Sequence, residues 1–327
     1  MIRVSVIIPT YNRADLLPTA ISSVLAQTYT DWELIVVDDA STDNTMEVIK
    51  EWEAKDSRIR SISLNINSGG PAHPKNVGVE SARGEFIAFL DHDDEWLPEK
   101  LKKQVAVFAS SPRIGLVTCE AYVVDDTGEI RGREIIPEIP KEGIIPAVLR
   151  KSFMFSNSSL VIPRVVIDHL GPRDESPNIG NAEDREYELR IASAGYEFGV
   201  VREPLFRYFV HSSNATLASP LSNRLHYAMA DFKYLSLYEK YNSQWMVYKS
   251  LAWGYLKLGD KDRAKEYRRR ALFSRPYDPR LIAAYVLSSW GRGGEFFLTG
   301  AVRAWHEMKY AAVKSKRWNR KMDPHVK

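Results

Sequence analysis

Cysteine is nearly absent from this sequence, since Cys119 is the only one among 327 residues. This scarcity excludes a disulfide framework and a cysteine-based zinc site within the chain. Long apolar runs are also missing, and none approaches the roughly 18 residues that a membrane-spanning helix requires. The apolar segment at the amino terminus is interrupted by Pro9, too early for the apolar core of a signal peptide. The chain is therefore expected to be made and kept in the cytoplasm.

A strong charge of either sign is missing as well. The formal net charge is +3, which argues against a dedicated nucleic-acid-binding protein, because such proteins carry a marked excess of basic residues. Hydrophobic residues make up 44% of the chain, which is ordinary for a globular protein with a sizeable core. The length predicts one large domain with a smaller one, or two domains.

Short β-branched runs alternate with amphipathic segments over the first 90 residues. The predicted order is a strand at 4–8, a helix at 14–27, a strand at 33–39, a helix at 43–55, a strand at 59–64, a helix at 74–83 and a strand at 86–90. This alternation predicts parallel pairing and an α/β sandwich. Ligands of such sheets bind beyond the carboxyl ends of the strands, where the polar stretches 10–13, 38–39 and 91–94 are expected to face one crevice.

The glycine-rich loop of dinucleotide-binding domains is not present. PTYNRA stands after the first strand, where a dehydrogenase would carry G-x-G-x-x-G. A phosphatase with an aspartyl nucleophile would carry its acidic triplet near the first strand, whereas here it follows the fourth. Both of these nucleotide-dependent or phosphate-dependent classes are therefore disfavoured.

The fourth predicted strand ends at Asp91-His92-Asp93-Asp94. Carboxylates this close repel one another unless a cation lies among them. Asp91 and Asp93 can offer the oxygen ligands that Mg²⁺ or Mn²⁺ prefers, and such an ion can bridge two phosphate oxygens of a nucleotide. A triplet of this kind is a weak signal by itself, because it also occurs as a helix cap.

Beyond residue 114 the pattern changes. Strands joined by a turn at 125–128 are followed by a proline-containing stretch, 133–150, which is predicted to be irregular. A helix is predicted to begin at Glu183-Asp184, and a strand to end at His211. From about residue 220 the chain is predicted to be mostly helical, with a helical hairpin that turns at 259–260.

Four stretches of this sequence occur together and in order. They are VSVIIPTYNR (4–13), ELIVVDDASTDNT (33–45), NVGVESARGEFIAFLDHDDEWLPEKL (76–101) and AEDREYELRIASAGYEF (182–198). The set resembles the family-2 glycosyltransferases of the GT-A fold. The resemblance implies a Rossmann-like sandwich that transfers a sugar from a nucleotide-diphosphate donor, usually with inversion at the anomeric carbon. It implies a catalytic domain over 1–218, with a nucleotide-binding half (1–110) and an acceptor-binding half (111–218), and a helical C-terminal region over 219–327.

The resemblance also implies a set of nucleotide-binding residues, which are Pro9, Tyr11, Arg13, Asp39, Lys75 and Asp91. Tyr11 would stack on the base, and Asp39 would accept a hydrogen bond from it. Arg13 and Lys75 would lie along the diphosphate, with a solvated surface position as the competing interpretation. The resemblance favours uridine as the base, and dTDP or GDP donors stay open.

For the metal, the resemblance implies Asp93 as the main ligand, with Asp91 and His211 beside it and Mg²⁺ or Mn²⁺ as the ion. Imidazole is a reasonable Mn²⁺ ligand. A structural role is the alternative for His211, and His92 is assigned no role. The ion would stabilise the charge that develops on the departing diphosphate.

For the reaction, the resemblance implies Asp184 as the base that takes the proton of the acceptor hydroxyl. Glu183 would be its neighbour or an acceptor contact, and Asp94 would support the acceptor side or the following turn. An acidic pair at the start of a helix is also ordinary complementarity to the helix dipole, which is the alternative interpretation.

One position departs from the family pattern, because Lys75 precedes the asparagine of the Asn-x-Gly stretch where the family often has arginine. Lysine supplies charge but not the two-pronged contact of a guanidinium. The QxxRW run of processive synthases is also missing, which favours addition of a single sugar to a glycan or a lipid-linked acceptor. The alternative is a non-catalytic nucleotide-sugar-binding or scaffold protein of the same fold. An intact set of Tyr11, Asp39, Asp93 and Asp184 argues against it.

The last segment, 301–327, is strongly basic, with eight lysine or arginine residues against two acidic ones and three large aromatic side chains. One interpretation is a solvated tail. The other is peripheral contact with the anionic cytoplasmic face of a membrane, where basic and aromatic residues act together.

Overall fold

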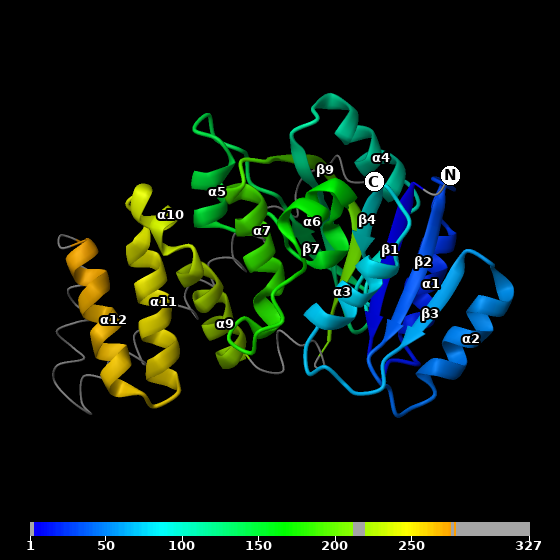
Figure 1. The fold of residues 1–327 in the computed structure, drawn as a ribbon, viewed down its shortest axis with the longest axis horizontal. Helices are drawn as coiled ribbons and strands as arrows, with labels where there is room; N and C mark the ends of the chain where they lie inside the picture. Colours follow the sequence, from blue (N-terminus) through cyan, green and yellow to red (C-terminus); the bar gives the residue numbers. More distant parts are fainter. Residues whose placement is uncertain (1–2, 212–219, 276–277, 279–327) are drawn as a thin grey trace. The chain divides into compact units, whose positions relative to one another are not determined.

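A computed structural model of the chain describes residues 3–211, 220–275 and 278, and Figure 1 shows it as a ribbon. The chain divides into two compact units, Met1–Tyr241 and Asn242–Lys327. In its described part the second unit is a helical hairpin, α11 (Gln244–Lys257) and α12 (Lys261–Ser274), as predicted. The basic segment 301–327 lies outside the described residues. Over the described residues, no helix combines the length and apolar character needed to cross a membrane.

The first unit contains a nine-stranded mixed sheet with helices between the strands. In chain order its strands and α-helices are β1 (Val4–Thr10), α1 (Leu17–Leu25), β2 (Trp32–Asp38), α2 (Thr45–Lys55), β3 (Ile59–Ser63), α3 (Ala72–Ser81), β4 (Phe86–Phe89), β5 (Glu95–Trp96), α4 (Lys100–Val107), β6 (Ile114–Asp125), β7 (Ile130–Glu134), α5 (Ile144–Arg150), β8 (Val161–Pro163), α6 (Arg164–Leu170), α7 (Glu183–Ser193), β9 (Glu197–Val210), α9 (Pro220–Lys233) and α10 (Leu235–Lys240). The α/β class expected from the sequence is confirmed.

The strand order is β3-β2-β1-β4-β8-β6-β9-β5, with β7 paired to β6. β1 pairs in parallel with β2 and with β4, and β2 pairs in parallel with β3, as the alternation predicted. In this register Thr10 lies beside Asp38. The carboxyl ends of β1, β2 and β4 therefore meet at one edge of the sheet, where the polar stretches that follow them come together.

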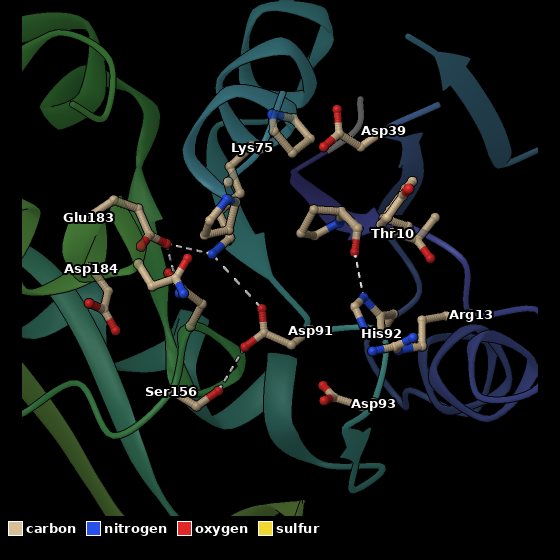
Figure 2. Close-up of a pocket in the computed structure, with 18 of the residues that line it drawn as sticks. Thr10, Arg13, Asp39, Lys75, Asp91, His92, Asp93, Ser156, Glu183 and Asp184 are labelled. Atoms are coloured by element: carbon tan, nitrogen blue, oxygen red, sulfur yellow. Dashed lines mark hydrogen bonds and ion pairs between the residues drawn. The ribbon is translucent and has the colours of Figure 1, made fainter. Parts of the chain in front are cut away.

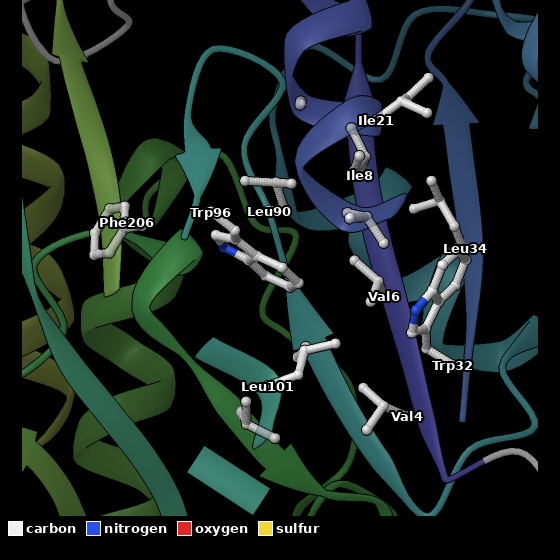
Figure 3. Close-up of a cluster of buried hydrophobic side chains, with 14 of the residues drawn as sticks. Val4, Val6, Ile8, Ile21, Trp32, Leu34, Leu90, Trp96, Leu101 and Phe206 are labelled. Carbon is white, nitrogen blue, oxygen red and sulfur yellow. The ribbon is translucent and has the colours of Figure 1, made fainter. Parts of the chain in front are cut away.

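The core beneath this edge explains why these strands are so apolar. Every residue of β1 and β2 is buried, since α-helices cover both faces of the parallel strands. Figure 3 shows Val6 and Ile8 of β1 packed with Ile21 of α1 and Leu34 of β2. A continuous β-branched run is the pattern that such two-sided burial selects.

The existence of α5 and the start of α1 differ most from the sequence prediction. α5 lies within 133–150, which was predicted to be irregular because of its prolines. Pro146 is the third residue of α5, where the missing backbone N–H would have no helical partner in any case, so the proline does not prevent the helix. α1 begins at Leu17 rather than at residue 14, and Pro18 stands in its first turn for the same reason.

The helices α9 and α10 belong to the first unit, although the catalytic domain was expected to end at residue 218. Arg185 of α7 is buried, and its guanidinium donates to the Asp231 carboxylate of α9 (2.9 Å) and to the Tyr238 hydroxyl of α10 (2.9 Å). Lys233 of α9 donates to the buried carboxylate of Glu186 (2.7 Å). These contacts hold α9 and α10 against α7. No local sequence pattern predicts the contacts, because the partners lie far apart in the chain.

Candidate active site

A cavity of about 430 Å³ opens at the carboxyl edge of the parallel strands. Its walls include all six residues expected to bind the nucleotide, together with Asp93, Glu183 and Asp184. Figure 2 shows Asp39 and Arg13 on one side of the cavity, Glu183 and Asp184 on the opposite side, and Asp91 between them. The fold thus brings these residues, which come from five separate parts of the chain, to one cavity.

Asp39 lies in the cavity wall with its carboxylate fixed by the loop after β3. The Ser68 backbone N–H (3.0 Å), the Ser68 hydroxyl (2.8 Å) and the Asn67 side-chain amide (3.1 Å) all donate to it. A carboxylate has about four accepting positions, so capacity for a further donor is left. Its neighbour Asp38 accepts instead from the Ser41 backbone N–H (3.3 Å), which braces the turn after β2.

Tyr11 and Arg13 follow β1 on the same side of the cavity. Tyr11 is 41% exposed and lines the cavity, so part of its side chain is accessible to a ligand. Asn12 between them has a positive φ of 51°, and its side-chain oxygen accepts from the Thr42 backbone N–H (2.8 Å). This local fold turns the chain sharply after the strand. The Arg13 guanidinium donates to the Asn12 carbonyl (2.8 Å) and lines the cavity.

Asp91 stands in the middle of the cavity wall, at the end of β4. One carboxylate oxygen accepts from the Ser156 hydroxyl (3.0 Å), and the other lies 3.9 Å from the Lys75 ammonium. Burial and the nearby charge of Asp93 raise the pKa of Asp91, while Lys75 opposes this rise. The protein therefore stabilises the anionic form of Asp91 only in part. A cation bound beside the carboxylate would offset the remaining cost of burial and of repulsion by Asp93.

Asp94 does not line the cavity, so its expected contact with an acceptor does not fit the structure. The side chain is 1% exposed and accepts from the hydroxyls of Ser158 (2.5 Å) and Ser156 (3.2 Å) beneath the wall. Burial, with the charges of Asp93 and Asp91, holds the pKa of Asp94 well above its usual range. By accepting these two hydrogen bonds, Asp94 holds in place the serine residues beside the cavity.

His211 follows β9, and its ring nitrogen Nε2 lies 3.2 Å from a carboxylate oxygen of Asp93. His211 is not part of the cavity wall, whereas Asp93 is. Within the described residues, no three acidic, histidine or cysteine side chains converge closely enough to hold a metal by themselves. Two carboxylates and an imidazole are nevertheless the donor types that suit Mn²⁺ or Mg²⁺, and the remaining ligands would come from phosphate oxygens and water.

Lys75 of α3 is buried rather than solvated on the surface, being only 2% exposed. Its ammonium donates to a carboxylate oxygen of Glu183 at 2.7 Å. Burial alone would raise the pKa of Glu183, but Lys75 and Arg173 outweigh that effect and lower it. Lys75 therefore links the carboxylate at the start of α7 with Asp91 at the end of β4.

Asp184 is the second residue of α7 and is 8% exposed in the cavity wall. Burial and the adjacent charge of Glu183 raise the pKa of Asp184 to about 7, with Lys75 and Arg173 opposing the rise. A carboxylate with this pKa both accepts and releases a proton near neutral pH, which suits a general base.

Sequence reasoning missed several residues of the cavity wall. Those from β9, α9, the loop between α5 and β8 and the turn before α7 are Phe155, Ser156, Asn157, Asn181, Tyr208 and Tyr227. The loop before α3 adds Asn67, Gly69, Gly70 and Pro71. The rings of Phe155 and Tyr208 pack edge to face, with centroids 4.8 Å apart. The sequence N-S-G-G-P at 67–71 predicts a loop after a strand, which could have indicated a contribution to the cavity. The stretch 155–157 has no comparable sequence pattern.

Residues 5–171 match the family described as glycosyl transferase family 2, so the chain belongs to that family of enzymes. Among curated relatives, the putative teichuronic acid biosynthesis glycosyltransferase TuaG of Bacillus subtilis is 45% identical over 31% of this chain and 40% of its own length. WfgD of Escherichia coli, a UDP-Glc:alpha-D-GlcNAc-diphosphoundecaprenol beta-1,3-glucosyltransferase, is 46% identical over 32% of this chain and 40% of its own length. The matched part thus spans well under half of either relative.

Solved structures share the fold at low sequence identity. Staphylococcus aureus TarS 1–349 in complex with UDP-GlcNAc gives a TM-score of 0.62 at 19% identity, covering 89% of this chain and 88% of that one. The mannosyltransferase PcManGT of Pyrobaculum calidifontis, in complex with GDP-Man and Mn²⁺, gives a TM-score of 0.58 at 22% identity, covering 95% and 86%. At such identities the likeness establishes the GT-A fold alone.

Proposed function

We propose that this chain is an inverting glycosyltransferase that moves a single sugar from a UDP-sugar to a glycan or lipid-linked acceptor. The observation that carries the proposal is the layout of one cavity. Tyr11 and Asp39, which would bind the nucleobase, line the same cavity as a buried carboxylate, Asp184, whose pKa of about 7 suits proton abstraction. Figure 2 shows Asp91 between Asp39 and Asp184.

On the nucleotide side, the ring of Tyr11 would stack on the base, and Pro9 also forms part of the cavity wall. Asp39 would accept a hydrogen bond from the imide N–H of uracil, using the capacity that its loop contacts leave. Arg13 would face the negative diphosphate. Lys75 is too deeply engaged with Glu183 to serve as a simple phosphate contact, so we assign it to holding the site's charges in place.

A divalent cation would be held by Asp93 and Asp91, with His211 beside Asp93, and would supply charge neutralisation for the leaving diphosphate. The residues fit such an ion, because burial and mutual repulsion disfavour the anionic state of Asp91 without one. Ser156 holds one oxygen of Asp91 at 3.0 Å, which fixes the direction in which the carboxylate presents its other oxygen.

On the opposite side, Asp184 would accept the proton of the acceptor hydroxyl as that oxygen attacks the anomeric carbon. The attack comes from the face away from the leaving diphosphate, which inverts the anomeric configuration. Glu183 stays anionic beside Asp184, because Lys75 lowers the pKa of Glu183, and its charge keeps the pKa of Asp184 high. Glu183 would therefore stay ionised, while Asp184 would accept and release the proton.

For the acceptor, the relatives support a polymer or a lipid-linked saccharide. WfgD is named for a lipid-diphosphate acceptor, and TuaG for the synthesis of teichuronic acid. The test of the proposal is a panel of sugar nucleotides incubated with the protein, Mn²⁺ and lipid-diphosphate-linked saccharide acceptors, with release of nucleoside diphosphate on sugar transfer to the acceptor as the readout. We expect one UDP-sugar to be consumed by wild type and not by Asp184→Asn. Consumption of none, or equal consumption by the variant, would refute the proposal.

A further inference from the structure

The helix α9 lies outside the stretch that matches the family, which ends at residue 171, and outside the catalytic domain expected from the sequence. Nevertheless its residue Tyr227 is part of the cavity wall. The other cavity residues described above stand on or follow strands of the sheet, lie in loops and short turns, or stand on α3 or at the start of α7. A side chain that reaches the cavity from this late helix calls for a functional explanation.

Tyr227 contacts the carboxylate of Asp184 directly. Its hydroxyl donates to Oδ2 of Asp184 at 3.3 Å, while Oδ1 accepts from the backbone N–H of Arg185 at 2.6 Å. Oδ2 thus has a donor from α9, and Oδ1 has a donor from α7, the helix that carries Asp184. Two donors on opposite oxygens fix the plane of a carboxylate, which otherwise rotates freely about its last bond.

Gly180, which lies just before α7, allows α9 to approach the start of that helix closely. This residue has a φ of +48°, and a Cβ placed on it would lie 2.4 Å from the imidazole ring of His226. Only glycine leaves room for that ring. Next to it, the Asn181 side chain, which also lines the cavity, donates to the Asn223 side-chain oxygen of α9 at 3.0 Å.

We propose that Tyr227 is a positioning residue for Asp184, so that α9 is an integral part of the catalytic centre. This inference rests on the proposed function, because it assigns Tyr227 a task toward the proposed base. The hydroxyl orients the carboxylate toward the acceptor and leaves proton transfer itself to Asp184. The charge of Asp184 and burial hold the pKa of Tyr227 well above its usual range, so the hydroxyl keeps its proton and acts as a donor.

The expected consequence of removing the hydroxyl has a definite sign. The charged groups that face Asp184 are Glu183, which raises its pKa, and Lys75 and Arg173, which lower it. Tyr227 donates to the ionised carboxylate, and such a bond favours the charged form. Tyr227→Phe should therefore move the titration midpoint of Asp184 upward, by about 0.5 to 1 pH unit for a hydrogen bond of ordinary strength.

Tyr234→Phe is the matched control, because it removes one hydroxyl from the same part of the chain. That hydroxyl donates to the buried carboxylate of Glu186 (2.8 Å), which is not part of the cavity wall. The midpoint is measured by ¹³C NMR of aspartate-labelled full-length protein, with the Asp184 carboxyl signal assigned by its loss in Asp184→Asn. This readout needs no substrate, so failure of the proposed function would appear separately, as absence of sugar-nucleotide turnover in wild type.

We expect the midpoint to rise in Tyr227→Phe and to stay unchanged in Tyr234→Phe. An unchanged midpoint in Tyr227→Phe, or an equal rise in both variants, would overturn the inference. If Tyr227→Phe does not fold, 3-fluorotyrosine incorporated at residue 227 keeps the packing and makes the hydroxyl a stronger donor. The midpoint should then fall relative to wild type, and a midpoint that stays in place would overturn the inference equally.

Discussion

The buried ion pair between Lys75 and Glu183 makes the sharpest prediction about stability. Lys75→Met keeps most of the side-chain volume but removes the ammonium that lies 2.7 Å from the Glu183 carboxylate. Both side chains are only 2% exposed, so the variant leaves a buried carboxylate without its partner. Breaking such a pair from one side costs about 3 to 5 kcal/mol of folding free energy.

The pH dependence of this loss follows from the pKa of Glu183. In wild type, the folded-state pKa is lowered, so the stabilisation is present above the unfolded value and is lost as the pH falls through the folded one. In Lys75→Met, burial without the ammonium raises the folded-state pKa instead, and the carboxyl can take up a proton. The loss of unfolding free energy in Lys75→Met relative to wild type should therefore be largest near pH 8.5 and smaller near pH 5.

Urea unfolding of both proteins at the two pH values measures this deficit. Lys103→Met is the control, because its partner Glu203 is 57% exposed and such surface pairs contribute about 0 to 1 kcal/mol. A loss below about 1 kcal/mol in Lys75→Met at pH 8.5, or a loss that does not change with pH, would refute the reasoning about this pair.

Two further predictions concern the site and the helix beside it. The turnover rate of wild type should rise as the pH increases through about 7, since the base must be ionised and the pKa of Asp184 is about 7, and a rate that falls over this range would contradict its assignment. Gly180→Ala should destabilise the protein by about 2 kcal/mol or more in thermal unfolding, because its Cβ would meet His226 at 2.4 Å. Gly128→Ala, at a φ of +81° with nothing within 4 Å, should cost only the backbone strain of about 1 kcal/mol, and equal losses would argue against the packing explanation.

Much of the fold and one side of the cavity could be predicted because the signals are local. The fully buried strands β1 and β2 appear in the sequence as β-branched runs, and parallel pairing follows from the helices between them. Once strand ends are placed at one edge, Tyr11, Asp39 and Asp91 must lie near one another. The structure does place them in one wall.

The remainder depends on contacts between residues far apart in the chain. Lys75 and Glu183 are 108 residues apart, so neither sequence context shows that both are buried together. Asp94 looks like its neighbours in sequence, but its carboxylate is held below the cavity wall by the hydroxyls of Ser156 and Ser158, which lie more than 60 residues further along the chain. Likewise, the sequence around α9 does not show that α9 packs on α7, because Asp231 of α9 pairs with Arg185, 46 residues earlier.

A nucleoside diphosphate and a divalent cation are expected to bind together beside Asp93. The first measurement is calorimetric titration of UDP, GDP and dTDP into the full chain, each with Mn²⁺ and with a chelator, with Asp93→Ala measured alongside wild type. We expect UDP to bind in the presence of Mn²⁺, and the chelator or the substitution to weaken binding about tenfold or more, which corresponds to about 1.4 kcal/mol. Binding of UDP with equal affinity in all conditions, or no binding of any nucleotide, would show that no such joint site exists.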